Sequence, residues 1–271
     1  RTPARPRSRG PDGRTPSPTK GPCVQHPVAL RSLKIALAFV GLLVGAGFAS
    51  GQEAMQYFVA FGNWGLWGVV LAAALMIVTG IAILQLGSYF QADEHTAVYD
   101  KISGPIISRV LDYGTLATLF AIGFVMFAGG GSTISQQFKG VPIWVGGAIM
   151  LVLVLLVGLL DVDKVTAAIG SLTPFLLAFV IFGCSYTLIT TDIDWHSINM
   201  SAEQVNTTLP NWWMAALNYT GLNVMCVVSM ALVIGGNYLD TRAAGLGGFI
   251  GGMGYLVMLM LLATALMVKI D

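Results

Sequence analysis

Between Leu33 and the end of the chain, seven long apolar runs alternate with short polar breaks. A helix rises ~1.5 Å per residue, so that about 20 residues cross a hydrocarbon core ~30 Å thick. Each run approaches or exceeds this length, and none has the polar stripe of a helix on the surface of a soluble protein. The pattern therefore predicts an all-α polytopic membrane protein. The predicted spans cover residues 33–59, 65–89, 107–130, 142–160, 165–189, 212–237 and 246–268.

The first 30 residues differ from the rest of the chain. Residues 1–30 are rich in Arg, Pro, Ser and Gly and contain few apolar side chains that a core would bury. Such a composition is typical of disordered segments. We therefore predict a disordered tail over residues 1–30 and a transmembrane domain over residues 31–271. The chain begins with Arg1 rather than Met and stops soon after the seventh run, so we expect a fragment of a longer protein.

The charges that remain indicate an orientation in the membrane. Hydrophobic residues make up 55% of the chain and charged residues only 10%, whereas soluble domains carry about 25% charged residues. The basic residues near the predicted spans fall mainly on the side of the N-terminus, namely Arg31, Lys34, Lys101, Arg109, Lys164 and Arg242. The longest loop of the other side, residues 190–211, has no Lys or Arg. We predict a multi-pass protein of the plasma membrane with a cytoplasmic N-terminus.

The tryptophans agree with this orientation. Amphipathic rings are favoured at membrane interfaces. All six lie at or beyond the predicted outer interface: Trp64, Trp67, Trp144, Trp195, Trp212 and Trp213.

The centre of the first run is rich in glycine. Gly41, Gly45, Gly47 and Gly51 fall within eleven positions, and each lowers helix stability by about 1 kcal/mol relative to Ala. One interpretation is close helix packing through small residues. The other is a discontinuous helix whose free backbone groups bind a solute or ion. The polar residues that follow favour the second interpretation. The candidate binding residues are Gly45, Ala46, Gly47, Phe48, Ala49, Ser50 and Glu53.

Glu53 is the acidic residue that lies well inside a predicted span. A charge near the centre of a bilayer costs ~2.5 kcal/mol or more, and such residues are functional candidates. Three interpretations remain open for it. Glu53 acts in binding, it faces a wet vestibule on the outer side, or it is a structural partner of a polar group on another helix.

The sixth run contains a second polar interruption. Tyr219, Thr220, Gly221 and Asn223 place two hydroxyls, a glycine and an amide inside an apolar stretch. Alone, such residues are typical of side chains that join packed helices. The first and sixth runs are, however, five apart in the count, as a repeat of five helices requires. This correspondence favours a binding site that both runs share.

Other motifs have plainer interpretations. The sequence contains none of the motifs of zinc proteases, serine hydrolases or P-loop enzymes, so we expect neither an enzyme nor a cofactor. The glycines of the seventh run are expected to form a helix-packing face. They are Gly247, Gly248, Gly251, Gly252 and Gly254.

Two stretches of the chain resemble the YkvI-like membrane proteins, a group related to the amino acid–polyamine–organocation transporter superfamily. They are residues 44–53, VGAGFASGQE, and residues 125–131, VMFAGGG, followed by Gln136-Gln137-Phe138. The resemblance implies a LeuT-like fold of two inverted five-helix repeats, with helices one and six unwound at Gly45–Phe48 and Tyr219–Asn223. It also implies transport of a small solute, such as an amino acid coupled to Na⁺ or H⁺. The chain departs from this fold, because ten helices are expected and only seven are predicted. The eighth, which is absent, helps to form the cation site in many relatives.

A secondary transporter of a small solute is the leading functional hypothesis. The alternative is a seven-helix receptor or sensor that transports nothing. Against this alternative, the last run has no Lys at mid-span to hold a retinal-type chromophore. The expected partners are the lipid bilayer, a small solute and Na⁺ or H⁺.

Overall fold

The structure is a computed structural model that describes residues 28–44, 48, 51–138, 140–191, 205 and 207–269. In this part of the chain every regular element is a helix. The helices are α1 (Val28–Leu43), α3 (Gln52–Tyr57), the 3₁₀ helix η1 (Val59–Phe61), α4 (Asn63–Phe90), α5 (His95–Gln137), α6 (Ile143–Gly158), α7 (Val162–Thr190), α9 (Trp212–Gly236) and α10 (Thr241–Val268). The predicted all-α class is confirmed for these residues. α1 begins just inside the predicted tail, whose residues 1–27 lie outside the described part.

Among the described residues, five helices are long and apolar enough to cross a membrane. They are α4, α5, α9, α10 and the part of α7 over Gly170–Thr190. The first and fourth predicted spans instead contain α1 and α6, each 16 residues long. At ~1.5 Å per residue, a helix of this length extends ~24 Å, less than a typical hydrocarbon core. A helical protein with several membrane-crossing helices is thus confirmed, but seven spans are not.

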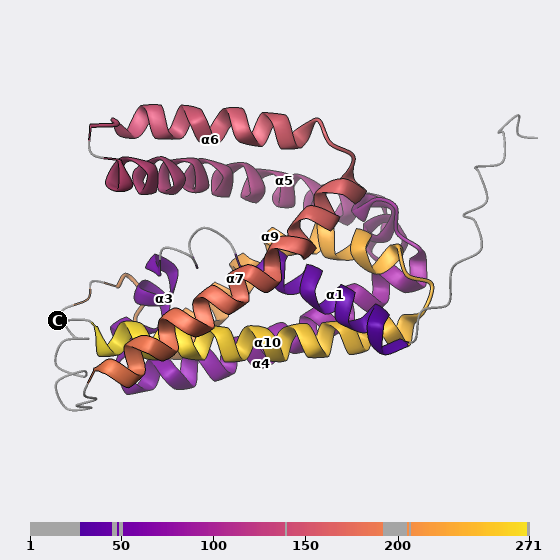
Figure 1. Cartoon of the computed structure of the whole chain (residues 1–271). Coiled ribbons are helices and arrows are strands. Elements are labelled where there is room, and N and C mark those ends of the chain that lie inside the picture. The colour runs from indigo at the N-terminus through magenta and orange to yellow at the C-terminus, as the bar shows by residue number, and fades with distance from the viewer. Residues whose placement is uncertain are drawn as a thin grey trace, which may run out of the picture.

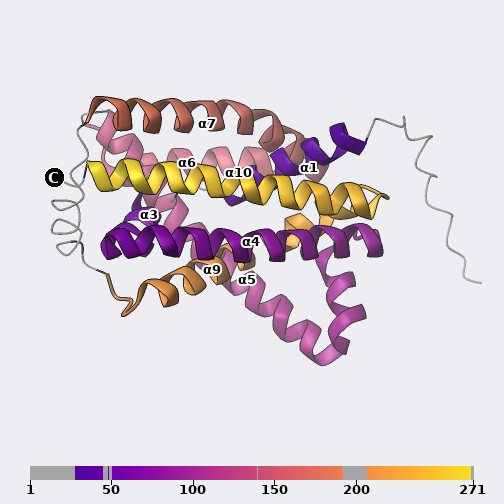
Figure 2. The ribbon, with the colours of Figure 1, turned by 90° about the horizontal axis from the view of Figure 1, so that it is seen from below.

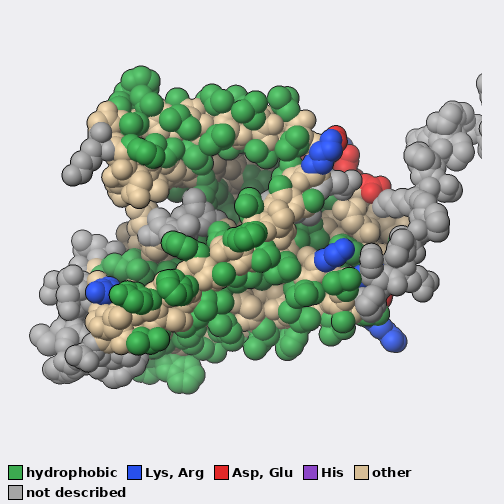
Figure 3. Space-filling view, viewed as in Figure 1, with side chains coloured by type: hydrophobic (Ala, Val, Ile, Leu, Met, Phe, Trp, Pro, Cys, Tyr) green, Lys and Arg blue, Asp and Glu red, His purple; other side chains and the backbone are tan. Residues whose placement is uncertain are grey.

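Four helices form the body of the molecule (Figures 1 and 2). α10 packs along α4 and α1, and α4 also packs along α9. α7 lies against α1 and α10. The core between the body helices includes Phe39, Met76, Tyr219, Tyr255 and Leu259. Hydrophobic side chains also cover much of the flanks in Figure 3, as expected for surfaces that face lipid tails.

Glycines let α10 approach its neighbours closely. A Cβ atom at Gly252 would lie 2.5 Å from Cγ1 of Ile77 on α4, and one at Gly247 would lie 2.6 Å from Cγ2 of Ile35 on α1. Such separations are shorter than van der Waals contact, so neither position has room for a larger residue. The predicted packing face is confirmed for Gly247, Gly248, Gly251 and Gly252, whereas Gly254 has ordinary contact distances.

The contact between α4 and α9 is tighter still. A Cβ atom at Gly87 of α4 would overlap the carbonyl oxygen of Leu232 on α9. In the reverse direction, a Cβ atom at Gly235 of α9 would overlap the carbonyl oxygen of Leu84 on α4. The two backbones therefore touch at a reciprocal pair of glycines, which fixes the position of α9 against α4.

α5 is bent, and with α6 it forms a hairpin that stands away from the body in Figure 1. Gly104 interrupts α5 with φ 74° and ψ 168°, and Pro105 follows it. The Nε2 atom of His95 lies 2.9 Å from Oδ1 of Asp112, so that side chains from both sides of the bend are joined. α6 packs on α5, and α5 in turn packs on α9.

Charged side chains and tryptophans lie mainly at opposite ends of the bundle. Most of the charged side chains visible in Figure 3 lie where α7 and α10 begin. At the other end, Trp64 of α4 and Trp212 of α9 stack with ring centroids 5.9 Å apart. The arrangement is the one that the predicted orientation requires, with basic residues on one side and tryptophans on the other.

This orientation can be tested by labelling single cysteines on intact cells with a membrane-impermeant maleimide. In a chain freed of its native cysteines, we expect Asp93→Cys and Leu239→Cys to react only after the membrane is opened. Thr208→Cys should react on intact cells, because residue 208 lies in the predicted outer loop and is exposed. Labelling of Thr208→Cys only from the inside would show that the topology is inverted.

Candidate functional site

The first apolar run is broken at two points. Val44, directly after α1, is not helical. Gly51, directly before α3, has a φ of 73°, in the left-handed region where a residue with a Cβ atom is strained. The run is thus divided into α1 and α3, whereas the stretch predicted to be unwound, Gly45–Phe48, lies outside the described residues except for Phe48, which is helical. Of the residues proposed to line the break, Phe48 and Glu53 are described, whereas Gly45, Ala46, Gly47, Ala49 and Ser50 lie outside the described residues.

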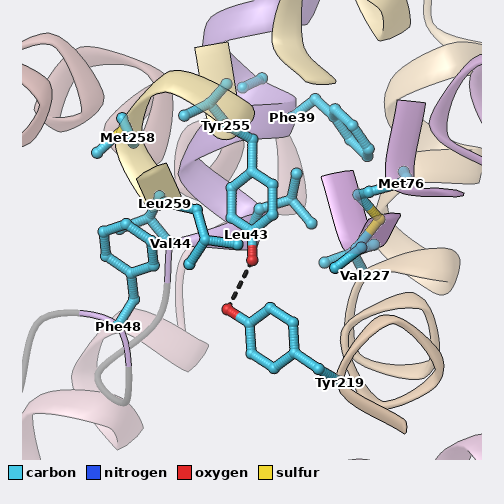
Figure 4. Close-up of a cluster of buried hydrophobic side chains, with 14 of the residues drawn as sticks. Phe39, Leu43, Val44, Phe48, Met76, Tyr219, Val227, Tyr255, Met258 and Leu259 are labelled. Carbon is cyan, nitrogen blue, oxygen red and sulfur yellow. Dashed lines mark hydrogen bonds between the residues drawn. The ribbon is translucent and has the colours of Figure 1, made fainter. Parts of the chain in front are cut away.

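Two tyrosine hydroxyls meet inside the bundle near this break (Figure 4). The hydroxyl oxygens of Tyr219 on α9 and Tyr255 on α10 are 2.6 Å apart, and each residue is 1% exposed. The surrounding side chains are apolar and include Phe48, whose ring centroid lies 6.2 Å from that of Tyr255. Buried hydroxyls are nearly always hydrogen-bonded. The pair thus satisfies part of its own hydrogen-bonding needs and joins α9 to α10.

Glu53 connects this pair to α3. It lies in the first turn of α3, its side chain is half-buried, and its carboxylate lies close enough to the side chain of Tyr219 to interact with it. An ionised carboxylate only accepts hydrogen bonds. A hydrogen bond between Tyr219 and an ionised Glu53 would thus be donated by Tyr219, which would then accept from Tyr255. Glu53, Tyr219 and Tyr255 come from three helices and form a cluster around the Tyr219–Tyr255 hydrogen bond.

Aromatic rings hold Tyr219 in place. The ring centroid of Tyr57 lies 5.2 Å from that of Tyr219, and the ring of Phe58 meets it edge to face at 5.0 Å. Aromatic pairs at such distances are favourable and directional. Because Tyr57 and Phe58 follow Glu53 within the same short stretch, one segment supplies both the carboxylate and the rings that orient its partner.

A cavity of about 200 Å³ lies beside Tyr57, at the end of the bundle that carries the tryptophans. Its lining is mostly polar and consists of Gln56, Tyr57, Thr207, Thr208, Leu209 and Asn218. Tyr57 lines the cavity and also contacts Tyr219, so its ring separates the cavity from the cluster around the Tyr219–Tyr255 hydrogen bond. This position fits the vestibule that the sequence allowed for Glu53.

The charge of Glu53 has no basic partner in the described part of the chain, where the ion pairs are His95–Asp112 and Lys164–Asp161. No cluster of three or more His, Cys, Asp or Glu residues that would hold a metal ion occurs among the residues described. A carboxylate inside an apolar bundle is costly unless something compensates its charge. A cation, a proton or the amino group of a solute would each do so.

The structure corrects the prediction for the sixth run. α9 is a continuous helix over Trp212–Gly236, without the break expected at Tyr219–Asn223. The physical reason is that its polar side chains are satisfied within the helix. The hydroxyl of Thr220 donates to the Ala216 carbonyl at 2.8 Å, and the amide of Asn223 donates to the Tyr219 carbonyl at 2.9 Å.

The candidates on α9 divide between its two sides. Tyr219, Thr220 and Asn223 are buried toward the body, whereas Gly221 is exposed with no atom near its Cβ direction. At 3.6 residues per turn, a residue two positions after Tyr219 lies on the far side of the helix. Gly221 is therefore not part of the hydrogen-bonded cluster.

Sequence reasoning missed Tyr255 and Tyr57. Tyr255 follows the glycines of the seventh run, and nothing in its local sequence distinguishes it from a packing residue. Its partner, Tyr219, is 36 positions away. A hydroxyl in an otherwise apolar run was the available signal, because a buried phenol needs a partner from another helix.

In comparison with known proteins, the chain is similar in sequence to two proteins of Bacillus subtilis. It is 31% identical to the uncharacterised protein YyaD over 206 residues, which cover 75% of this chain and 56% of YyaD. It is 22% identical to the uncharacterised membrane protein YkvI over 219 residues, which cover 81% of this chain and 61% of YkvI. The chain thus spans little more than half the length of these relatives.

No family model matches the chain, and no solved structure matches it significantly. The apolar helices and the match to a membrane protein together identify a multi-pass membrane protein. The chain is a homologue of YkvI, and its predicted resemblance to the YkvI-like membrane proteins is confirmed.

Proposed function

We propose that this chain carries the solute site of a secondary transporter of the plasma membrane, with its N-terminus in the cytoplasm. The solute is a small molecule with an amino group, such as an amino acid, and its transport is coupled to Na⁺ or H⁺. The observation that carries the proposal is the broken first run, which brings Glu53 beside Tyr219, whose buried hydroxyl is hydrogen-bonded to that of Tyr255. A packing role alone would not require a carboxylate there.

The packing of the body supports a LeuT-like arrangement. In two inverted five-helix repeats, the first helix corresponds to the sixth and the second to the seventh. Here α1, α4, α9 and α10 are the helices of the first, second, sixth and seventh runs. Exchanging the two repeats converts the contact between α1 and α10 into the contact between α9 and α4. The same exchange leaves the contacts α4–α10 and α1–α9 unchanged. All four contacts occur in the body.

The chemistry of the site suits a cationic group. Glu53 supplies a negative charge, and the described neighbours of that charge supply hydroxyls and aromatic rings rather than basic groups. The amino group of a solute or a coupling cation would compensate the carboxylate. The polar cavity beside Tyr57 would admit it from the side that carries the tryptophans.

Helix α9 departs from the LeuT-like pattern. α9 is continuous where the LeuT-like pattern has an unwound sixth helix, so backbone groups of α9 do not contribute as they would in a pair of broken helices. The side chains of Tyr219, Thr220 and Asn223 would have to replace them. Because the chain spans only 56% and 61% of its two relatives, transport is proposed for the whole protein.

The proposal is tested by uptake into proteoliposomes that contain the full-length protein. ¹⁴C-labelled L-amino acids are offered one at a time, under an inward Na⁺ gradient, an inward proton gradient or no gradient. We expect at least one amino acid to accumulate above the level in protein-free liposomes, and only when one of the gradients is present. Absence of accumulation for every amino acid under both gradients would overturn the amino-acid assignment.

A further inference from the structure

A second cavity lies at the opposite end of the molecule from the cavity beside Tyr57. It has a volume of about 410 Å³ and lies between α1, α7 and the end of α9. Its lining consists of Lys34, Leu37, Ala38, Ala167, Gly170, Ile234, Asn237 and Tyr238. The polar groups come from α1 and from the residues that follow α9, whereas small and apolar side chains of α1, α7 and α9 form the remaining walls. The cavity thus has a basic part and an apolar part.

One cation lines the basic part of the cavity, and a second lies close to it. Lys34 lines the cavity, and Arg31 lies one turn earlier on the same side of α1. Arg31 is also near Tyr238: burial raises the pKa of the Tyr238 phenol, and the positive charge of Arg31 opposes that shift. The lining therefore combines an ammonium group, a phenol and an amide, with a guanidinium group close by.

The segment that carries Asn237 and Tyr238 is held firmly. The hydroxyl of Ser88 on α4 donates to the Tyr238 carbonyl at 2.6 Å, and the Tyr238 N–H donates to the Gly235 carbonyl at 3.1 Å. Gly236 abuts the backbone of Ala92, where a Cβ atom would overlap the carbonyl oxygen. The polar groups on this wall are thus positioned before any ligand arrives.

The positive charge of the cavity is not compensated by the described part of the chain. Neither Arg31 nor Lys34 forms an ion pair with a described carboxylate. Three carboxylates at the same end have other partners. Asp161 pairs with Lys164 at 2.8 Å, Asp112 pairs with His95 at 2.9 Å, and Asp240 accepts from the first N–H groups of α10.

We propose that this cavity binds the phosphate group of an anionic phospholipid, with Lys34, Asn237 and Tyr238 as its polar contacts and Arg31 as a second positive charge beside it. Ammonium and guanidinium groups are the usual ligands of phosphate, and basic pockets between membrane helices bind anionic headgroups. The apolar wall formed by Leu37 and Ile234 suits the start of a lipid chain better than a free ion. The site is separate from Glu53 and does not depend on transport.

Native mass spectrometry of the purified protein measures this binding. The probe is phosphatidylglycerol, compared with phosphatidylcholine. Each cation near an anionic headgroup contributes about 1 kcal/mol, which corresponds to about fivefold in affinity. We expect Lys34→Gln to weaken phosphatidylglycerol binding about fivefold and the double variant Arg31→Gln/Lys34→Gln to weaken it more than tenfold. Lys34→Arg, which keeps the charge, should bind nearly as well as the wild type.

Lys101→Gln is the matched control, because it removes a basic charge from the same end of the molecule but outside the cavity. It should leave phosphatidylglycerol binding unchanged. Equal binding by the wild type, the double variant and Lys101→Gln would overturn the proposed site. Tight, Lys34-dependent binding of glycerol phosphate or inorganic phosphate in phosphatidylcholine nanodiscs would instead identify a site for soluble phosphates and overturn the lipid assignment.

Discussion

Glu53→Gln should reduce gradient-driven uptake by at least about tenfold while leaving the amount of folded protein in the membrane unchanged. The substitution keeps the size of the side chain and its ability to accept a hydrogen bond from Tyr219, but it removes the charge. Hydrogen bonds to charged groups contribute about 1.5–3 kcal/mol, and losing such an interaction with a cationic group of the solute or with the coupling ion corresponds to tenfold or more. Uptake of the responsive amino acid into proteoliposomes, normalised to reconstituted protein, measures the effect.

Two further variants separate charge from structure. Glu94→Gln makes the same chemical change at an exposed position before α5, and it should transport like the wild type. Tyr255→Phe removes the hydroxyl that Tyr219 accepts from, so it should reduce uptake to a smaller extent than Glu53→Gln. Wild-type uptake by Glu53→Gln across a range of pH would rule out a functional role. Loss of folded protein with normal activity per molecule would show that Glu53 is structural.

Gly87→Ala should destabilise the protein by about 1–3 kcal/mol, although alanine is the better helix former. The added Cβ atom would overlap the carbonyl oxygen of Leu232, a backbone atom that cannot rotate away. Relief requires α4 and α9 to separate, and overpacking of this kind costs 1–3 kcal/mol or more. The measurement is the midpoint of thermal unfolding in detergent.

Gly123→Ala is the matched control for this prediction. Gly123 also lies within a long helix, α5, but a Cβ atom there would meet nothing within 4 Å. The intrinsic helix preference of alanine, about 1 kcal/mol over glycine, should then act alone. We expect Gly123→Ala to match or exceed the wild-type stability. Equal stability of the two variants would mean that α4 and α9 do not touch at Gly87.

Hydropathy predicted the long helices well where they cross the apolar layer. The run over residues 212–237 became α9 over Trp212–Gly236, and the run over 65–89 became α4 over Asn63–Phe90. In lipid, every backbone group must find its partner inside the protein, so an apolar run of this length forms a helix. Helix α5 shows the limit of the method. Its part after the interruption at Gly104 begins close to the predicted residue 107, whereas the part from His95 to Ser103 was not predicted, because its charged residues lower the hydropathy.

The site was only partly predictable for a different reason. Glycine weakens helices locally, so the break of the first run could be inferred from its own composition. Whether α9 unwinds at Tyr219 depends on where Thr220 and Asn223 find acceptors, and both use carbonyls of their own helix. The pairing of Tyr219 with Tyr255 depends on how two distant helices pack. No periodicity within either run contains that information.

The row of hydroxyls beside Glu53 has a direction, and the direction depends on charge. An ionised carboxylate only accepts, so the proton of Tyr219 would point toward Glu53 and the proton of Tyr255 would point toward Tyr219. Once the carboxyl group carries a proton, it can donate instead, and both phenols can then turn their protons the other way. A change of charge at Glu53 on α3 would thus reverse the donor and the acceptor in the hydrogen bond between Tyr219 and Tyr255, and no heavy atom would have to move for this.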